Sequence, residues 1–377
     1  MTLEKFSSFD EIKKSLEKKE ADCKTVVSHY LKNIRTKAHL NAFVEVYAQS
    51  ALEQAELIDE KLAKGKAGKL AGMIIGIKDV LNYAGHEANA SSNILKGYIS
   101  QFTTTAVQRL IDEDAIVIGR LNCDEFGMGS SNENSAHGKV LNALDESRVP
   151  GGSSGGSAVA VQANLCTVSL GTDTGGSVRQ PAAFTGVIGM KPTYSRVSRW
   201  GLIAYASSFD TIGIFSKTVK DNALVMEIMA GHDEMDSTSS RKPVLHYSEL
   251  LHFDKKAKIA YLKETLESPA LQPEIRANTL SVLEKLKSAD ILVMSLAENN
   301  GNYSTAFKNI FDWCSRIGAK VFQDKPMLLM ATSPGARGGL SVLEIAKNAL
   351  PRYGGNIKAT FSLPSFNENF DVVNNTI

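Results

Sequence analysis

Hydrophobic and polar positions in the first two thirds of the chain follow alternating helix and strand patterns. Apolar residues recur at helical spacing through residues 6–64, which predicts amphipathic helices. Residues 73–77 and 115–119 are short, almost wholly apolar runs that predict buried strands, and residues 103–114 between them predict a helix. Apolar strands that alternate with helices are typical of a sheet covered on both faces. The pattern predicts an α/β fold.

A second group of elements follows in the last quarter of the chain. Strand-like runs at 289–295, 325–331 and 359–362 alternate with helical patterns at 303–316 and 341–350. Because strands connected through helices are usually parallel neighbours, this order predicts a β-α-β-α-β unit.

Composition narrows the class of protein. With 377 residues and a formal net charge of +1, the chain is long enough for two domains, and its overall charge does not argue for direct binding to nucleic acid or acidic membranes. An RNA presented by another subunit stays compatible with this charge. The four cysteines stand far apart without a CxxC motif, which argues against a zinc site or a disulfide framework. Without a secretory leader or a long apolar run, we expect a cytoplasmic protein with neither a bound metal nor a membrane contact.

Two glycine-serine loops carry the strongest chemical signal. They read Gly-Gly-Ser-Ser-Gly-Gly-Ser at residues 151–157 and Gly-Thr-Asp-Thr-Gly-Gly-Ser at residues 171–177. Glycines let the backbone bend sharply and expose N–H groups beside a serine, as acyl transfer through an oxyanion requires. A serine nucleophile also needs a base. Lys78, at the end of the predicted strand 73–77, would serve if burial lowers its pKa.

Other interpretations of these residues stay open at this point. A lysine at a strand end is usually a solvated surface charge. Glycine-rich loops also form tight turns or cradle phosphates, although neither loop has the lysine of a Walker motif. The first loop follows Val149-Pro150 rather than a predicted strand, so it fits a dinucleotide fingerprint poorly.

The two loops and their surroundings resemble a known family. The segments that carry the resemblance are residues 124–130, 132–135, 151–157, 171–181, 189–194 and 196–202. Together they are similar to the amidase signature family, and within it to the branch that supplies tRNA-dependent amidotransferases with their glutaminase, the A subunit. The resemblance implies a mixed sheet flanked by helices and covers the chain from its N-terminus to about Lys287.

The resemblance also implies a role for each matched residue. Ser177 would be the nucleophile, Ser153 a bridging serine held by a cis peptide bond, and Lys78 the base that draws a proton through Ser153. Backbone N–H groups would form an oxyanion hole, and a short strip would line the substrate pocket. The oxyanion-hole residues would be Thr174, Gly175, Gly176 and Ser177, and the strip would be Met128, Gly129 and Ser130.

A substrate and partners are implied in the same way. Glutamine would be hydrolysed to glutamate, and the ammonia would pass to the B subunit of a complex that also contains a C subunit. The B subunit would bind the tRNA and use ATP and Mg²⁺ to convert Glu-tRNA(Gln) into Gln-tRNA(Gln). The amidase step itself would need no cofactor.

After about Lys287 we expect a different origin for the chain. Residues 289–377 resemble the second half of an NADPH-dependent FMN reductase of the flavodoxin-like fold, and the segments that carry this resemblance are residues 298–303, 307–313 and 332–339. It implies that FMN would be contacted by Asn300, Gly301, Ser333 and Gly335. The loop that holds the flavin phosphate in that fold has no counterpart here, which argues against FMN binding.

The sequence therefore predicts two incomplete enzymes joined near Ser288, a truncated amidase signature domain at 1–288 and a partial flavodoxin-like segment at 289–377. We expect impaired glutamine hydrolysis, because the family's C-terminal groups that hold the ends of glutamine have no counterpart and orientation would be lost. Three alternatives stay open: a general amidase for small amides, a flavin-binding oxidoreductase, and an inactive chimera.

Overall fold

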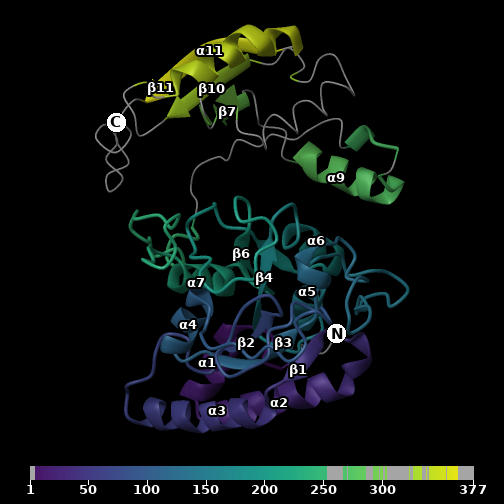
Figure 1. The fold of residues 1–377 in the computed structure, drawn as a ribbon, viewed down its shortest axis with the longest axis vertical. Coiled ribbons are helices and arrows are strands. Elements are labelled where there is room, and N and C mark those ends of the chain that lie inside the picture. The colour runs from purple at the N-terminus through teal and green to yellow at the C-terminus, as the bar shows by residue number, and fades with distance from the viewer. Residues whose placement is uncertain are drawn as a thin grey trace. The chain divides into compact units, whose positions relative to one another are not determined.

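A computed structural model divides the chain into two compact units, Met1–Phe253 and Asp254–Ile377 (Figure 1). It describes residues 5–252, 266–269, 271–285, 292–296, 298–299, 302–303, 322, 326–332, 337, 339–353 and 355–363. The junction predicted near Ser288 lies outside these residues, so the division into 1–288 and 289–377 stays a prediction. Each unit is described by itself below.

The first unit is built on a six-stranded mixed sheet with the strand order β1-β3-β2-β4-β6-β5. The strands are β1 (Phe43–Val46), β2 (Ile74–Lys78), β3 (Ile116–Leu121), β4 (Val168–Asp173), β5 (Ile188–Met190) and β6 (Thr211–Ser216). β2 is parallel to β3 on one side and to β4 on the other, whereas β1 and the pair β5–β6 run antiparallel to their neighbours. Every residue of β2, β3 and β4 is buried. For β2 and β3 the apolar runs at 73–77 and 115–119 predict this burial.

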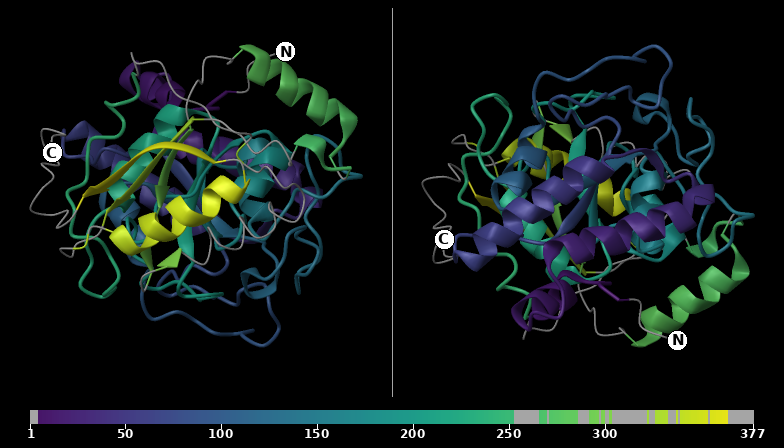
Figure 2. Two further views of the ribbon diagram at one scale, coloured as in Figure 1. Left: turned by 90° about the horizontal axis from the view of Figure 1, so that it is seen from above. Right: turned by 90° about the horizontal axis from the view of Figure 1, so that it is seen from below.

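Helices flank this sheet, which confirms the predicted α/β class. They are α1 (Phe9–Glu17), α2 (Cys23–Thr36), α3 (Ala48–Ala63), α4 (Thr105–Asp112), α5 (Gly155–Gln162), α6 (Arg179–Thr185) and α7 (Val219–Met229). α2 and α3 lie side by side, and α3 packs on β3 (Figure 2). The first turns of α1, α2 and α7 are capped by the side chains of Ser8, Asp22 and Thr218, which satisfy N–H groups that a helix start leaves free.

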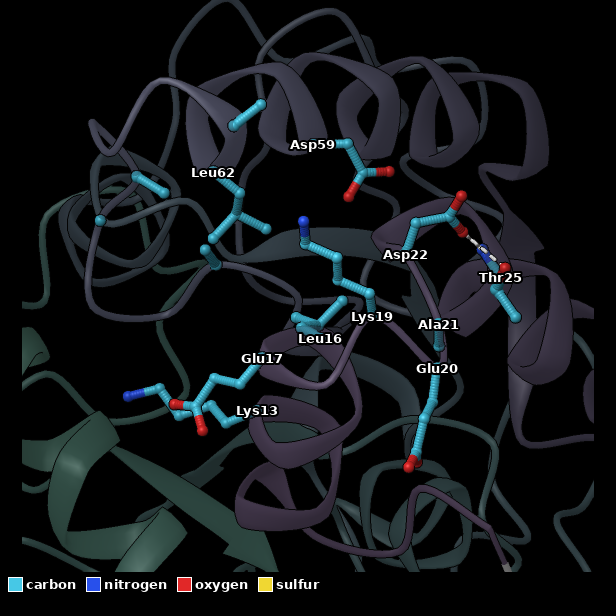
Figure 3. A pocket seen from close by; sticks show the side chains of 14 residues that line it. Lys13, Leu16, Glu17, Lys19, Glu20, Ala21, Asp22, Thr25, Asp59 and Leu62 are labelled. Atoms are coloured by element: carbon cyan, nitrogen blue, oxygen red, sulfur yellow. Dashed lines mark hydrogen bonds between the residues drawn. The ribbon is translucent and has the colours of Figure 1, made fainter.

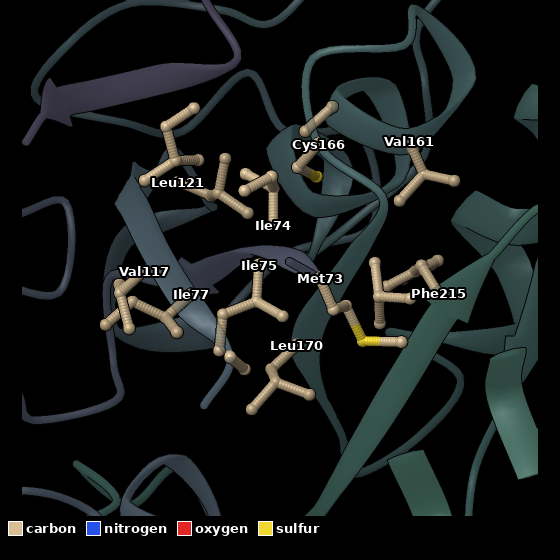
Figure 4. Packing of buried hydrophobic residues seen from close by; sticks show 14 of the residues in the cluster. Met73, Ile74, Ile75, Ile77, Val117, Leu121, Val161, Cys166, Leu170 and Phe215 are labelled. Carbon is tan, nitrogen blue, oxygen red and sulfur yellow. The ribbon is translucent and has the colours of Figure 1, made fainter. Parts of the chain in front are cut away.

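The core of the first unit surrounds β2. Ile74, Ile75 and Ile77 lie among side chains from the neighbouring strands, including Leu121 of β3 and Leu170 of β4 (Figure 4). All of these side chains are fully buried, and each contributes about 2 kcal/mol through removal of apolar surface from water. This packing fixes the strand whose last residue is Lys78.

The second unit contains a three-stranded parallel sheet with the order β11-β10-β7. Its strands are β7 (Leu292–Leu296), β10 (Pro326–Thr332) and β11 (Asn356–Leu363), and helix α11 (Leu340–Ala349) connects the last two. Three further elements are α9 (Pro273–Lys285), β8 (Glu298–Asn299) and β9 (Asn302–Tyr303). A small core of its own includes Met327, Leu329 and Val342.

The parallel order confirms the three strands and the last helix that periodicity predicts for this segment. The predicted helix over 303–316 differs at its start, because Tyr303 pairs with Glu298 in the hairpin of β8 and β9. Residues 304–316 lie outside the described part of the chain. None of the described helices has the length and apolarity of a membrane span.

Candidate active site

Lys78 is the last residue of β2, which is a central strand of the first sheet. In the parallel ladders Lys78 pairs with Leu121 of β3, and Ile77 pairs with Leu170 of β4. The carboxyl ends of these strands therefore meet at one edge, where parallel sheets usually place their functional groups. Thr172 reaches the same edge at the end of β4.

The Lys78 side chain is 0% exposed, so it is not the solvated surface charge that a strand-end lysine usually is. Its Nζ donates to the hydroxyls of Ser153 at 2.8 Å, Ser154 at 2.9 Å and Thr172 at 2.8 Å. Three hydroxyl oxygens satisfy the three N–H groups of an ammonium. None of the three carries a charge that would hold the proton on the amine.

Burial lowers the pKa of Lys78 from its ordinary 10.5 to about 8, because removal from water disfavours the ammonium form. The negative charges of Asp124, Asp173 and Asp210, together with the Cys123 thiol, act in the opposite direction and only partly offset burial. An amine with this pKa can accept a proton near neutral pH.

Ser153 lies just before α5, in a loop whose backbone is held from several sides. The peptide bond between Gly152 and Ser153 is cis, as the family resemblance implies. The Ser153 carbonyl accepts from the N–H of Asp124 at 3.1 Å. A Cβ at Gly152 would overlap the Asp124 carboxylate, so only glycine fits at that position.

The loop that carries Ser177 is organised by the buried carboxylate of Asp173. This carboxylate accepts from the N–H groups of Gly176 at 2.9 Å and Val178 at 3.1 Å, and from the Arg179 guanidinium at 2.9 and 3.0 Å. Burial raises the pKa of Asp173, but the hydrogen bonds from Arg179 and Val178 outweigh burial and hold the pKa below its ordinary value. The carboxylate therefore stays charged and keeps the turn in place.

The structure brings the two serine loops together through their backbones. The Ser154 N–H donates to the Ser177 carbonyl at 3.3 Å. The Ser177 side chain is half-buried and its hydroxyl makes no hydrogen bond within the described part of the chain. Lys78 and Ser153 are in direct contact, whereas Ser177 adjoins Ser154 through its backbone. Among the described residues no hydrogen bond joins the hydroxyls of Ser153 and Ser177.

The N–H groups expected to form an oxyanion hole differ in whether they already donate a hydrogen bond. The Gly176 N–H already donates to Asp173. Those of Thr174, Gly175 and Ser177 make no hydrogen bond to any described residue. The Thr174 hydroxyl donates to Asp210 at 2.5 Å, which fixes this side of the loop.

The strip Met128–Ser130 lies beside the same loops. Met128 is 52% exposed, Gly129 packs on the side chain of Asp124, and the Ser130 carbonyl accepts from Gln180 at 2.9 Å. The residue before the strip, Gly127, faces the base, since a Cβ there would lie 3.6 Å from Ser153 Oγ and 3.9 Å from Lys78 Nζ.

Several residues that hold the site have no role predicted from the sequence. They are Asp124, Ser154, Thr172, Asp173, Gln180 and Asp210. The first five stand inside the glycine-rich segments or beside the strip, so their place in the sequence was a usable signal. Asp210 lies outside every motif, and its contact with Thr174 depends on the pairing of β4 with β6.

The residues predicted to contact FMN, Asn300, Gly301, Ser333 and Gly335, lie outside the described residues. Among the residues that the structure does describe, no cluster of three or more histidine, cysteine or acidic side chains is arranged to hold a metal ion.

A separate pocket of about 710 Å³ lies between α1, α2 and α3. Figure 3 shows Lys19 extending between Leu62 and Asp59 in this pocket. None of the residues that line it is a predicted site residue, and Asp59 is already engaged with the N–H groups that begin α2. The pocket is therefore distinct from the Lys78 site.

Comparison with known proteins finds relatives over most of the chain. A protein from Chlorobium phaeobacteroides, named as the A subunit of glutamyl-tRNA(Gln) amidotransferase, is 44% identical over 303 residues, 80% of this chain and 64% of that protein. One of the same name from Acidobacterium capsulatum is 51% identical over 252 residues, 66% of this chain and 53% of that protein. The crystal structure of the same subunit from Thermotoga maritima superposes with a TM-score of 0.56 and 40% identity, over 64% of this chain and 51% of that one.

The chain thus spans slightly less than two thirds of the Chlorobium relative and about half of the other two. A family model described as Amidase matches residues 25–313. This match runs to residue 313, somewhat past Lys287, where we expect the resemblance to end. Because the model covers most of the chain, including both serine loops and Lys78, the chain belongs to the amidase family.

Proposed function

We propose that this chain is the amide-hydrolysing A subunit of a tRNA-dependent amidotransferase, with glutamine as its substrate. The relatives named as the A subunit of glutamyl-tRNA(Gln) amidotransferase support the assignment to an amidotransferase. The observation that carries the chemistry is the fully buried Lys78, which lies 2.8 Å from the Ser153 hydroxyl beside the loop of Ser177.

The proposed reaction begins with a proton transfer. Neutral Lys78 accepts the proton of the Ser153 hydroxyl while Ser153 accepts the proton of Ser177. The Ser177 oxygen then attacks the carboxamide carbon of glutamine, and backbone N–H groups stabilise the oxyanion. Thr174, Gly175 and Ser177 have N–H groups available for this role. The proton returns through Ser153 to the departing ammonia, and water later releases glutamate from Ser177.

The proposed partners are the B and C subunits of the amidotransferase. The B subunit would receive the ammonia, bind the tRNA and use ATP with Mg²⁺, so the amide-hydrolysing chain itself would need no cofactor. With this assignment we expect the chain to act in the cytoplasm.

The test is active-site labelling combined with a glutaminase assay. A fluorophosphonate reagent is expected to label the parent chain and the control Ser28→Ala, which removes an exposed hydroxyl on α2. Ser177→Ala should lose both labelling and glutamate release. Equal labelling of Ser177→Ala and the parent would refute the assignment of the nucleophile.

A separate measurement distinguishes the amidotransferase from a general small-amide amidase, which would use the same three residues. The chain should co-purify with co-expressed B and C subunits and raise Gln-tRNA(Gln) formation by them. Hydrolysis of simple amides without either effect would favour the general amidase.

The flavodoxin-like assignment of residues 289–377 has one supporting observation, the parallel order of β7, β10 and β11 with α11 between the last two. We propose it as a second, testable candidate. Uptake of added FMN with flavin absorbance in the purified chain would support a flavin-binding function, and a chain that takes up no FMN would remove flavin binding as a candidate function.

A further inference from the structure

The side chain of Gln180 forms hydrogen bonds to two segments of the site, the loop of Ser153 and the strip Met128–Ser130. The proposed reaction requires these two segments to keep their relative positions. Gln180 stands in the first turn of α6, three residues after Ser177. Its Oε1 accepts from the N–H of Gly152 at 2.9 Å, and its Nε2 donates to the carbonyl of Ser130 at 2.9 Å. Since an N–H only donates and a carbonyl only accepts, the two contacts fix which end of the amide faces which partner.

The loop around Gly152 is shaped to receive this amide. A Cβ at Gly151 would lie 2.8 Å from Gln180 Oε1 and 2.9 Å from the backbone of Pro181, so a glycine is required for the approach. Gly151 also has a φ of +84°, which disfavours other residues.

Ser153 and the residue before it are consequently held by three hydrogen bonds. Gln180 holds the preceding N–H of Gly152, Asp124 holds the Ser153 carbonyl, and Lys78 contacts the hydroxyl. Gln180 is itself anchored on the nucleophile's loop, because its backbone N–H donates to the Gly176 carbonyl at 2.8 Å.

We infer that Gln180 is a positioning residue that couples the substrate strip Met128–Ser130 to the loop of the bridging Ser153. The inference rests on the proposed function, because the strip and the bridging serine take their roles from it. The acceptor end of the amide keeps the Ser153 hydroxyl in line with Lys78 and so acts on the rate of acylation. The donor end holds the strip and so acts on substrate binding.

Three substitutions separate these two ends. Gln180→Glu keeps an acceptor for Gly152 but cannot donate to Ser130. Gln180→Leu has similar bulk and makes neither bond, and Gln180→Asn has the same chemistry but is too short to reach both partners. Gln162→Leu is the matched control. Gln162 also bridges loops, with bonds to the Ala143 N–H at 2.9 Å and the Thr185 carbonyl at 3.0 Å, and within the described part of the chain it makes no hydrogen bond to a site residue.

The readouts are the rate of Ser177 labelling by the fluorophosphonate, and kcat and KM for glutamine. We expect Gln180→Leu and Gln180→Asn to lower the labelling rate and kcat about tenfold or more. Gln180→Glu should keep both within about threefold while KM rises. Gln162→Leu should lower thermal stability and leave kcat and the labelling rate near the parent values.

The outcomes separate the positioning role of Gln180 from the proposed function of the chain. If the parent is labelled and Gln180→Leu matches it, or if Gln180→Glu falls as far as Gln180→Leu in kcat, the positioning role is overturned. If the parent is labelled at Ser177 but releases no glutamate from glutamine, the proposed function fails while the labelling series still decides the role of Gln180. A parent without labelling at Ser177 overturns both.

Discussion

At the scale of single residues, Lys78 controls how the reaction should respond to pH. Its pKa of about 8 means that only about a tenth of the amine is neutral at pH 7 and most of it is neutral at pH 9. The labelling rate of Ser177 should therefore rise about tenfold per pH unit below this value and level off above it. The measurement is the labelling rate between pH 6 and 10.

Another lysine with a lowered pKa provides the control for that profile. Lys191 is half-buried, and burial lowers its pKa, but its Nζ donates to the Pro192 carbonyl rather than to a site hydroxyl. Lys191→Met should keep the parental midpoint, whereas Lys78→Met should lose labelling at every pH. A flat profile in the parent would exclude Lys78 as the base.

The same pKa predicts a dependence of stability on pH. The folded pKa of about 8 lies below the ordinary 10.5, so between these values the unfolded chain binds more protons and the free energy of unfolding rises with pH. Relative to Lys78→Met, the parent should gain on the order of 3 kcal/mol from pH 8 to pH 10.5. Urea denaturation across this range measures the difference, and parallel pH curves for the two proteins would contradict it.

At the scale of elements, close packing of α5 against the end of β3 explains one of the loop glycines. A Cβ at Gly156 would overlap the carbonyl oxygen of Asn122 and lie 2.7 Å from that of Ala42, and neither backbone atom can move cheaply. Gly156→Ala should therefore lower the free energy of unfolding by about 2 kcal/mol or more.

Gly175 offers a matched comparison in the second loop. A Cβ there would meet no atom within 4 Å, and its backbone is outside the left-handed region. Gly175→Ala should change the free energy of unfolding by less than about 0.5 kcal/mol. Urea denaturation of both variants decides the point, and equal losses would mean that α5 does not pack as described.

The strands also show which elements a local hydrophobic pattern can predict and which it cannot. The runs at 73–77 and 115–119 correspond to β2 and β3 within one or two residues, because strands buried on both faces leave a continuous apolar signal. β6 was not predicted, since Gly213 and the polar residues at its ends interrupt the run. Its place depends on pairing with β4, a contact between distant segments that local patterns do not encode.

The features of the site also divide into those that the sequence pattern predicts and those that depend on contacts between distant segments. The pattern placed Lys78 at a strand end but could not tell a buried amine from a solvated one, and 75 residues separate it from Ser153. Their association was expected only from the family resemblance. The bridging contacts of Gln180 could not be predicted, because they require the relative positions of three loops.

At the scale of the whole molecule, the site residues Lys78, Ser153 and Ser177 all belong to the first compact unit, Met1–Phe253. The large hydrophobic core that fixes β2 lies entirely within that unit. A protein that comprises only residues 1–253 should therefore fold and label at Ser177.

Mass-spectrometric mapping of the label in this fragment is the measurement. The fragment with Ser177→Ala is the control and should carry no label at this site. A fragment that melts cooperatively but does not label would show that the reactive arrangement needs residues beyond 253.

The enclosure of Lys78 has a practical consequence for chemical footprinting. Acetic anhydride or an N-hydroxysuccinimide ester modifies amines that solvent can reach, and this side chain has no exposed surface. In the native protein Lys78 should stay unacetylated while surface lysines such as Lys64 react. Its first modification on heating would then report the opening of the sheet around it, at a single identifiable tryptic peptide.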